Sequence, residues 1–200
     1  MPPIANNVWT SLEVVKLIVS GLSPILVIII GLFLNKRLKQ FEHRQWRNQK
    51  LIEKRLIVYD DLAPLLNDIL CYYTFVGNWK ERSPKEIIDL KRIIDKKIYL
   101  AAPIFCKDFF SACMIFINIC YESYTGWGQD AKLRTKIQRR QDAFGSKWDK
   151  EWNNLFCMDN CPDPKQIRVA YLNIMNVFSQ EIGLQHNHLN VTGRIPENIN

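Results

Sequence analysis

The feature that most limits the fold of this 200-residue chain is a long uncharged run near its beginning. All 19 positions from Leu17 to Asn35 lack charge, and most of them are Leu, Ile or Val. As a helix they would cover about 28 Å, close to the hydrocarbon thickness of about 30 Å in a bilayer. A core helix of a soluble protein is rarely apolar on every face, so the run predicts a transmembrane helix.

The charges on either side of this run predict how it is oriented. A cleaved signal peptide would carry its basic residues before the apolar run and small residues at a cleavage site. Here Lys16, offset by Glu13, precedes the run, whereas Lys36, Arg37 and Lys39 follow it. The helix is therefore expected to stay attached in the inner (plasma) membrane, with the N-terminus outside and the C-terminal bulk in the cytoplasm. The three cations that follow are expected to contact anionic lipids.

The rest of the chain predicts an all-α fold. Residues 1–35 would form an extracytoplasmic N-terminus and the transmembrane helix, residues 36–183 a basic cytoplasmic helical bundle, and residues 184–200 a polar flexible tail. A helix is expected to continue from the membrane to about Leu62, where Pro64 ends or kinks it. The sequences Ser83-Pro84-Lys85-Glu86 and Asp163-Pro164-Lys165-Gln166 are helix starts, each with a capping residue followed by proline.

An apolar segment from about Ile104 to Tyr124 raises the question of a second span. Only 13 uncharged residues separate Asp108 from Glu122, too few to cross a bilayer, so a buried helix is the prediction. No alternating pattern indicates a β-strand. The last helix is expected to run through Ile182 and to end at Gly183.

The six cysteines are interpreted as core residues and not as disulfides, because the cytoplasm is reducing. Cys106, Cys113 and Cys120 recur every seven residues along one helical stripe, where a thiol packs as a small apolar group. Cys157 and Cys161 are spaced for a metal, but the three histidines are distant in sequence and no second cysteine pair completes a zinc pattern. No metal and no cofactor are predicted.

Positive charge is concentrated in two segments, which we name the first and second basic clusters. The first basic cluster, residues 36–55, has eight Lys or Arg against two Glu, a net charge of +6. The second basic cluster, residues 131–147, has six against one Asp, a net charge of +5. The whole chain carries +7, so the remainder is acidic on balance.

The second basic cluster predicts a binding site for an anion. It lies between aromatic residues, and cations beside aromatic rings suit a nucleotide or a single-stranded nucleic acid, whose bases can stack. The alternative is a solvated helix face with no ligand. The candidate ligand-binding residues are Lys132, Arg134, Arg139 and Arg140, with Trp127 and Trp148 for stacking. Arg139 and Arg140 are expected to form an exposed pair that contributes little to stability.

The transmembrane helix carries a pattern of its own, which we name the small-residue stripe. On a helical projection Lys16, Ser20, Ser23, Val27 and Gly31 fall on one face, and large aliphatic residues cover the others. Small residues let helices approach closely, and hydroxyls can bond across the contact, so a homo-oligomer is predicted. Four or more copies could enclose a pore lined by the two serines; a contact without a pore is the simpler interpretation.

No catalytic motif was found: there is no phosphate-binding glycine loop, no paired histidines with a carboxylate and no nucleophile elbow. An enzyme is therefore not predicted.

Two stretches and their neighbours resemble a family of small bacterial membrane proteins with one N-terminal span and a helical cytoplasmic domain. They are the segment from Leu65 to Lys80 and the segment from Gly126 to Thr135, together with Ser83-Pro84, Lys91-Arg92 and Asp95. The architecture is similar to membrane effectors of anti-phage systems, including the channel-forming partner of a nucleotidyltransferase in Hailong-type defence. The resemblance implies an oligomeric channel kept shut by a DNA oligomer that the nucleotidyltransferase makes. No ligand residue of the family maps onto a position here.

The sequence thus favours a homo-oligomer (tetramer or larger) that forms a gated ion pore in antiviral defence, controlled by an anionic nucleotide or oligonucleotide. The alternative is a non-conducting membrane scaffold that recruits a protein partner through its helical domain.

Overall fold

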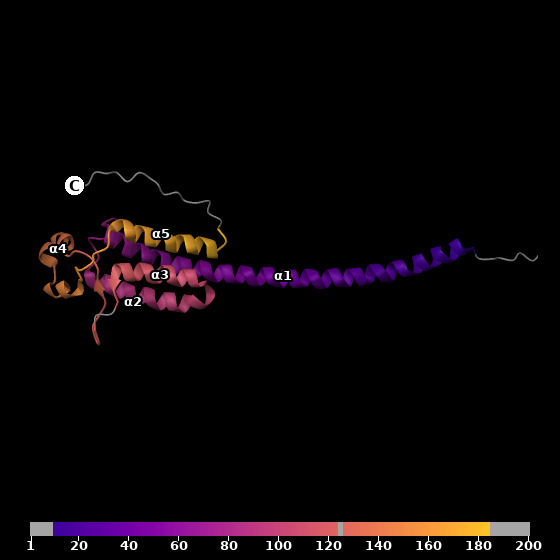
Figure 1. The fold of residues 1–200 in the computed structure, drawn as a ribbon, viewed down its shortest axis with the longest axis horizontal. Helices are drawn as coiled ribbons and strands as arrows, with labels where there is room; N and C mark the ends of the chain where they lie inside the picture. Colours follow the sequence, from indigo (N-terminus) through magenta and orange to yellow (C-terminus); the bar gives the residue numbers. More distant parts are fainter. Residues whose placement is uncertain (1–9, 124–125, 185–200) are drawn as a thin grey trace, which may run out of the picture. The chain divides into compact units, whose positions relative to one another are not determined.

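A computed structural model describes residues 10–123 and 126–184 of the chain, and the described part is mostly helical (Figure 1). It divides into two units, Met1–Lys50 and Leu51–Asn200. The predicted tail lies outside the described residues except for Leu184, and so do His186 and His188.

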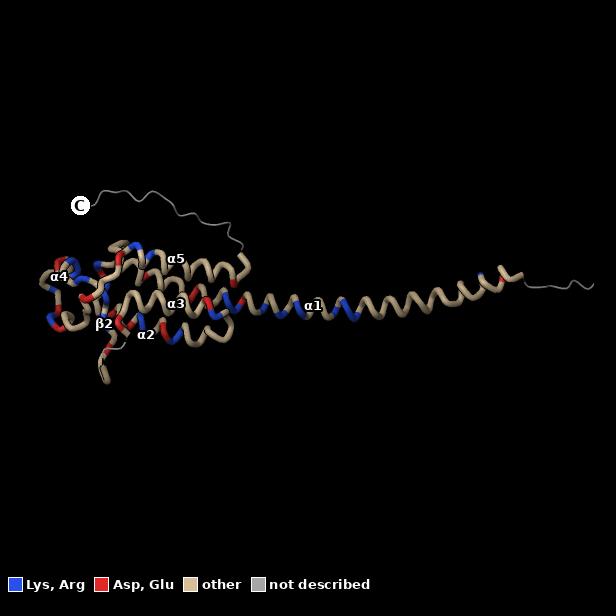
Figure 2. The backbone as a smooth tube through the Cα atoms, in the orientation of Figure 1, with Lys and Arg blue, Asp and Glu red and all other residues tan. Residues whose placement is uncertain are grey.

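In the first unit, the described residues form the beginning of helix α1, Ser11–Thr74. Every residue from Thr10 to Lys50 is exposed, including the whole apolar run. Among the described residues, α1 is the one helix that is long and apolar enough to cross a membrane. Figure 2 shows how charge is distributed along it: Lys and Arg follow the apolar run closely, and few charges precede it.

The second unit contains the rest of α1, then α2 Pro84–Ala101, the 3-10 turn η1 Ala102–Ile104, and α3 Lys107–Cys120. The two short strands β1 Tyr121–Glu122 and β2 Lys132–Leu133 follow, and then α4 Gln138–Phe144, η2 Gly145–Lys147, η3 Lys150–Leu155 and α5 Pro164–Glu181. Both predicted helix starts are confirmed: Ser83 with Glu86, and Asp163 with Gln166, form capping boxes. Helix α5 ends at Glu181, one residue before the predicted end, and Gly183, with φ +78°, follows the C-cap residue Ile182.

Helix α1 continues through Pro64 to Thr74, so of the two expected outcomes at Pro64, an end or a kink, the end is wrong. A proline inside a helix costs about 3 kcal/mol. Against this, Leu62, Leu66 and Ile69 are completely buried on either side of it, and each such side chain stabilises the fold by about 1.5–3 kcal/mol. The ring of Pro64 is exposed, so the backbone carbonyl that loses its partner can be solvated.

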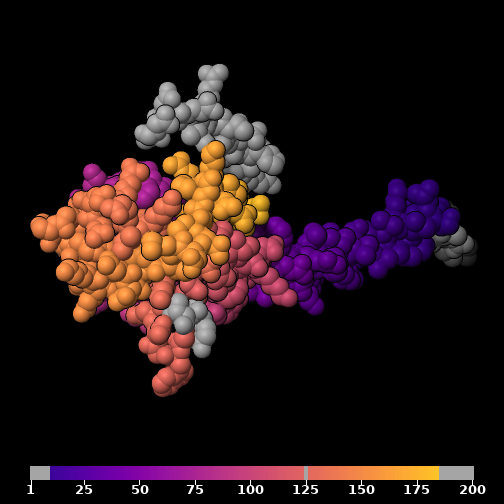
Figure 3. All heavy atoms as spheres, turned by 60° about the vertical axis from the view of Figure 1, so that its left-hand side comes forward, coloured from indigo at the N-terminus to yellow at the C-terminus, as the bar shows by residue number. Residues whose placement is uncertain are grey.

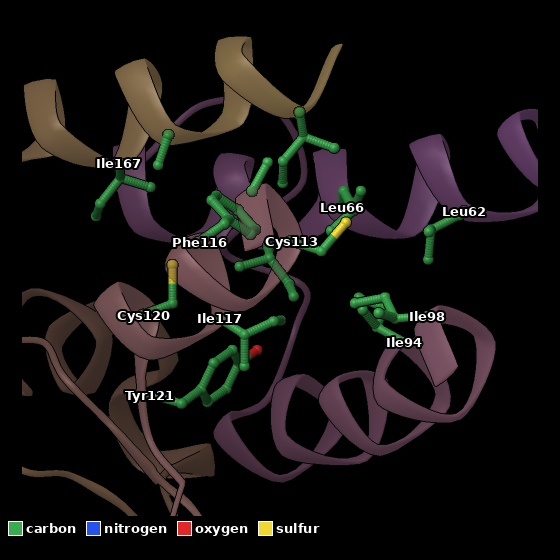
Figure 4. Close-up of a cluster of buried hydrophobic side chains, with 14 of the residues drawn as sticks. Leu62, Leu66, Ile94, Ile98, Cys113, Phe116, Ile117, Cys120, Tyr121 and Ile167 are labelled. Carbon is green, nitrogen blue, oxygen red and sulfur yellow. The ribbon is translucent and has the colours of Figure 1, made fainter. Parts of the chain in front are cut away.

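The core of the second unit lies where α1, α2, α3 and α5 meet (Figure 4). Helix α3 packs chiefly on α5, through Phe109 against Phe178 and Phe116 against Tyr171. Its inward face is completely buried, which confirms a core helix in place of a second span. Cys113 and Cys120 belong to this face, as predicted, whereas Cys106 is half-buried just before the helix; all six cysteines are free thiols.

The expected absence of strands is wrong. Helix α3 ends at Cys120, four residues earlier than expected, and the chain leaves it as β1, which pairs antiparallel with β2. The buried Tyr121 explains this ending, because its hydroxyl donates to the carbonyl of Ile87 at 3.0 Å and holds the chain extended. Two-residue strands are too short to show any alternation in the sequence. The part of their connection that the structure describes after residue 125, residues 126–131, projects from the body of the second unit (Figure 3).

Candidate ligand pocket

The second unit contains a pocket of about 630 Å³ where three segments converge. The first is the end of α1, the second runs from the end of β2 through α4, and the third is the approach to α5 and its first turn. The lining residues are Tyr73, Phe75, Thr135, Lys136, Gln138, Arg139, Asp142, Cys161, Pro162, Asp163, Pro164 and Ile167. The middle segment belongs to the second basic cluster, the segment for which the sequence predicts an anion-binding site.

Two residues at or next to this pocket have a left-handed backbone conformation. Phe75 has φ +59° and Asn160 has φ +57°, and they are the non-glycine residues with positive φ in the described part of the chain. For a bulky residue such as Phe75 this conformation is unfavourable by about 1–3 kcal/mol. It ends α1 in a left-handed cap, with the N–H of Val76 donating to the carbonyl of Cys71 at 3.1 Å. Such strain is concentrated at binding sites, and here it places an aromatic ring in the pocket wall.

Arg139 lies over this ring. Its guanidinium carbon is 4.3 Å from the centroid of Phe75 and 5.9 Å from that of Trp79, an arrangement in which cation and aromatic face attract each other. The residue itself is exposed. It therefore presents a solvated cation and a planar surface at the pocket.

Arg140, its neighbour, is only 1% exposed, so the expectation of an exposed pair is wrong. Its guanidinium donates to the carbonyl of Tyr72 at 2.7 Å, to the hydroxyl of Thr135 at 2.9 Å and to the carbonyl of Lys136 at 3.0 Å. It also lies 4.2 Å from the ring centroid of Tyr72 and 4.7 Å from that of Phe75. Helix α4 turns one of two adjacent arginines outward and the other inward, which a count of charges cannot reveal.

The buried cation makes the pocket wall positive. Among the described residues, the hydrogen-bond partners of Arg140 are two carbonyls and a hydroxyl, with no carboxylate to neutralise it. Burial lowers the pKa of Arg140, but an arginine side chain stays charged in proteins. Phe75, Thr135 and Lys136 separate the guanidinium from the pocket, and an anion there would face this charge through one layer of protein.

The pocket is lined by carboxylates as well as cations, and this restricts the chemical class of ligand that fits it. Besides Lys136 and Arg139, the carboxylate residues Asp142 and Asp163 also line this pocket. Asp163 already accepts from the N–H of Lys165 at 2.7 Å, and Asp142 accepts from Gln138 at 3.0 Å. The pocket thus offers cations, an aromatic face and hydrogen-bond acceptors, a combination suited to a ligand with phosphate, ring and amino groups.

The other predicted ligand residues lie elsewhere. Lys132 is in β2, and Arg134, half-buried, follows it; Trp127 is 98% exposed in the connection between the strands. Trp148 packs in an aromatic cluster with Phe144, Trp152 and Phe156, and its indole N–H donates to Asn153 at 2.9 Å. The structure therefore brings Arg139 to the pocket, places Arg140 behind its wall and leaves the remaining four residues outside it.

Sequence reasoning missed Phe75 and the beginning of α5 as parts of the site. Nothing in the sequence relates position 75 to positions 135–142, because they meet only when α4 packs against the end of α1. Lys136 was within the second basic cluster and could have been named with Arg139.

A second hollow of about 430 Å³ lies beside α2 and η3. Its charged lining is mainly acidic and suits an anion poorly. These residues are Lys85, Asp89, Arg92, Asp130, Asp149 and Glu151.

The small-residue stripe is fully exposed on α1. The hydroxyls of Ser20 and Ser23 donate to carbonyls of their own helix, those of Leu17 at 3.0 Å and Val19 at 2.7 Å. A side chain added at Gly31 would meet no atom of the chain, so this face is open for another helix. Lys16 and Val27 complete the stripe and are likewise exposed.

Cys157 and Cys161, considered for a metal, donate to the nearby carbonyls of Asp159 and Met158. Within the described ranges, no three His, Cys, Asp or Glu side chains gather as metal ligands would. Comparison with known proteins found no matching family model, no matching curated protein and no matching solved structure.

Proposed function

We propose that this chain is an oligomeric membrane effector that forms an ion pore gated by an anionic nucleotide or a single-stranded oligonucleotide. The observation that carries this proposal is the pocket, in which Arg139 and Lys136 lie beside the ring of Phe75 and in front of the buried Arg140. Helix α1 would take part in both ion conduction and ligand binding. It contains the apolar run, and it also ends at this pocket.

The chemistry of the pocket favours a nucleotide over a simple anion. Phosphate groups would be bound by Lys136 and Arg139, and a base would stack on the face that Phe75 and Arg139 form together. Exocyclic amino groups of a base could donate to Asp142 or Asp163. Inorganic phosphate would use only the cations and would meet the repulsion of both carboxylates.

The membrane part of the proposal is supported by the length and exposure of the apolar run in α1. The excess of Lys and Arg after it supports an N-out, C-in orientation in the inner membrane, with Lys36, Arg37 and Lys39 against anionic lipids. The resemblance to membrane effectors of anti-phage systems supports a role in defence, with a nucleotidyltransferase as the source of the ligand.

A pore would require several copies of α1 in contact along the small-residue stripe. Ser20, Ser23 and Gly31 allow a close approach of helices, and the two hydroxyls could face water in an assembly of four or more copies. Ligand binding at the end of α1 would then bias the arrangement of the same helix in the membrane.

Binding is tested on the full-length protein in detergent, with fluorescently labelled short single-stranded DNA and RNA and with nucleoside triphosphates. Arg139→Gln should weaken binding at least tenfold, and affinity should fall steeply with added salt because phosphate contacts release counterions. The matched control is Lys147→Gln, which removes an exposed cation of the same cluster outside the pocket. Equal losses in the two variants would show general attraction to the cluster and contradict a site.

Gating is tested by reconstituting the protein in vesicles loaded with an ion-sensitive dye. Ion flux should change when the bound ligand is added or withdrawn, and Arg139→Gln should abolish that change. Labelling of a C-terminal tag from outside intact cells would overturn the proposed orientation and with it a cytoplasmic ligand.

A non-conducting scaffold is the second candidate, and one observation favours it. The hydroxyls of Ser20 and Ser23 already donate to carbonyls of their own helix. The small-residue stripe therefore does not require contact with water in a pore. On this alternative, the oligomer forms but vesicles stay impermeable with and without ligand, and a protein partner binds the second unit.

A further inference from the structure

The small-residue stripe continues beyond the apolar run as a second stripe on the same helix. We name it the heptad stripe, and it consists of Leu34, Leu38, Phe41, Gln45 and Asn48. Its spacings alternate between four and three residues. From Ser20 through Val27 and Gly31 to Asn48, eight steps cover 28 residues, an average of 3.5. That is the period at which one face of a helix stays against a partner helix in a left-handed coiled coil.

The heptad stripe has no partner within the described chain. Leu34, Leu38 and Phe41 are 56–60% exposed, about as much as the aliphatic residues of the apolar run. Leu34, Leu38 and Phe41, with the flanking Asn35 and Arg37, line a shallow groove along the surface of α1. An apolar side chain of a neighbouring helix would fill such a groove as a knob fills a hole.

The charges around the heptad stripe are arranged for a parallel neighbour of the same sequence. With Leu38 at position a and Phe41 at position d of a heptad, the outer positions b, c and f hold most of the cations. These residues are Lys36, Lys39, Arg47 and Lys50. Arg37 falls at position g and Glu42 at the following e, the two positions that meet between parallel helices in register. In the single chain Arg37 lies over Phe33, its guanidinium carbon 5.3 Å from the ring centroid.

Two members of the stripe are polar and uncharged. Gln45 and Asn48 each carry a donor and an acceptor, so each can pair with its own copy on an adjacent helix. Polar residues at such positions fix the register and the number of strands, because any slip would leave them against apolar neighbours. An antiparallel or staggered arrangement would lose both these pairs and the Arg37–Glu42 contact.

We propose that residues 34–48 form a parallel, in-register coiled coil with the same segment of other copies of this chain. The proposal rests on the homo-oligomer of the proposed function, and it adds an interface that starts in the last residues of the apolar run and extends beyond it to residue 48. Lys36 and Lys39 remain on the outside of the coil, where they can still contact anionic lipid headgroups.

Disulfide cross-linking of the full-length protein in native membranes tests this. Single cysteines are introduced at positions 34 to 48, one at a time, and oxidised, with the wild type as the background from the native thiols. Leu38→Cys and Gln45→Cys should give at least fivefold more cross-linked product than Lys36→Cys, Lys39→Cys and His43→Cys. A flat profile, or a maximum at the outer positions, would overturn the coiled coil.

The variant Val27→Cys tests whether the chain oligomerises through the small-residue stripe, independently of the coiled coil. If Val27→Cys cross-links while no position from 34 to 48 does, the oligomer stands and the coiled coil is wrong. If neither cross-links, the oligomer and the coiled coil fail together, while nucleotide binding by the second unit is measured independently.

Charge exchange tests the parallel register. In a Leu38→Cys background, Arg37→Glu and Glu42→Arg should each reduce cross-linking about twofold, the effect expected for an exposed ion pair. The double variant should restore it, because the pair is reformed with its charges exchanged. Failure of the double variant to recover would contradict the parallel, in-register arrangement.

Discussion

The two basic clusters differ far more in structure than in composition. In the first, residues 36–50 lie on one exposed stretch of α1, and Arg55, at its end, forms an ion pair with Glu181 in the second unit. In the second, the chain passes through β2, α4 and η2, so cations a few residues apart have different surroundings. Arg140 is buried, Arg134 is half-buried and Lys147 is exposed. The two clusters thus have similar charge counts, but nearly all cations of the first are exposed, whereas those of the second range from buried to exposed.

Arg55 in the first basic cluster and Arg140 in the second both donate hydrogen bonds to carbonyls at helix ends. Arg55 donates to the carbonyls of Glu181 and Ile104, each at 2.7 Å, at the ends of α5 and η1. Arg140 donates to the carbonyl of Tyr72 in the last turn of α1. The last carbonyls of a helix have no partner within it, and a cation is favoured there by the helix dipole. The difference between a structural and a solvated cation is therefore set by which helix ends lie within its reach.

The largest effect is expected for Arg140. Arg140→Ala should lower the free energy of unfolding of the second unit by about 3 kcal/mol or more, because the buried carbonyl of Tyr72, the buried hydroxyl of Thr135 and the part-buried carbonyl of Lys136 lose their donor. The matched change in the first cluster, Arg44→Ala, should stay within about 0.5 kcal/mol, since that residue is exposed. Urea unfolding of the protein in detergent, followed by tryptophan fluorescence, measures both. Equal effects would show that the clusters do not differ in the way described.

Arg55 should give the next largest loss of stability. This would distinguish it from the exposed cations of the first basic cluster. Besides its two carbonyl partners, its guanidinium pairs with the carboxylate of Glu181 at 2.7 Å, and its side chain is 18% exposed. Arg55→Ala should cost about 2 kcal/mol, and amide hydrogen exchange should quicken in the last turn of α5. Lys54→Ala, which changes the exposed neighbour, is the control. An unchanged exchange rate in α5 would mean that Arg55 does not hold that helix end.

The sequence predicted those parts of the fold that depend on local chemistry. The starts of α2 and α5 followed from a capping side chain and a proline within four residues, and the helix end before Gly183 from the last residues of α5. The apolar stretch of α1 was recognisable as a local run of uncharged residues. The continuation of α1 through Pro64 was not predictable, because the burial of Leu62 and Leu66 that outweighs the cost of the proline depends on helices distant in sequence.

The pocket was predicted only as a region of charge. Arg139, one of the predicted ligand residues, lines the pocket. Arg140 was assigned the same exposed role but is buried, because adjacent residues on a helix point about 100° apart. Phe75 could not be found, since its place in the wall depends on the left-handed turn that ends α1. Pairing of β1 with β2 depended on the burial of Tyr121, which two-residue strands do not signal.

Alkaline pH should distinguish the core of the second unit from the exposed part of α1 that carries most of the first basic cluster. Burial raises the pKa of the Cys113 thiol to about 12 from an ordinary value of about 9. Below pH 9 the thiol is protonated in both states and has no effect. Between pH 9 and 12 the unfolded chain loses this proton and the folded chain keeps it, so stability falls by as much as about 1.4 kcal/mol per pH unit.

The measurement is urea unfolding of the second unit, within the full-length protein, at several pH values from 8 to 11. Cys113→Ala should make the decline with pH shallower, even though the variant starts less stable. Far-ultraviolet circular dichroism should retain the helical signal of residues 11–50, which bury no titrating group. A slope unaffected by Cys113→Ala would show that this thiol does not contribute to the alkaline loss.

The smallest effect on stability is expected for Arg139, and it bears most on function. Its guanidinium lies over Phe75 in an exposed position, a contact worth about 0.5–1 kcal/mol. Arg139→Gln should therefore cost no more than about 1 kcal/mol, close to the effect of Arg47→Gln in the first basic cluster and far below that of Arg140→Ala. Urea unfolding of the three variants under one condition gives the order directly. If Arg139→Gln cost as much as Arg140→Ala, its guanidinium would be structural and unable to turn toward a phosphate, and lost binding in that variant would report unfolding. A small cost together with lost binding would assign to Arg139 the ligand role that the structure denies to Arg140.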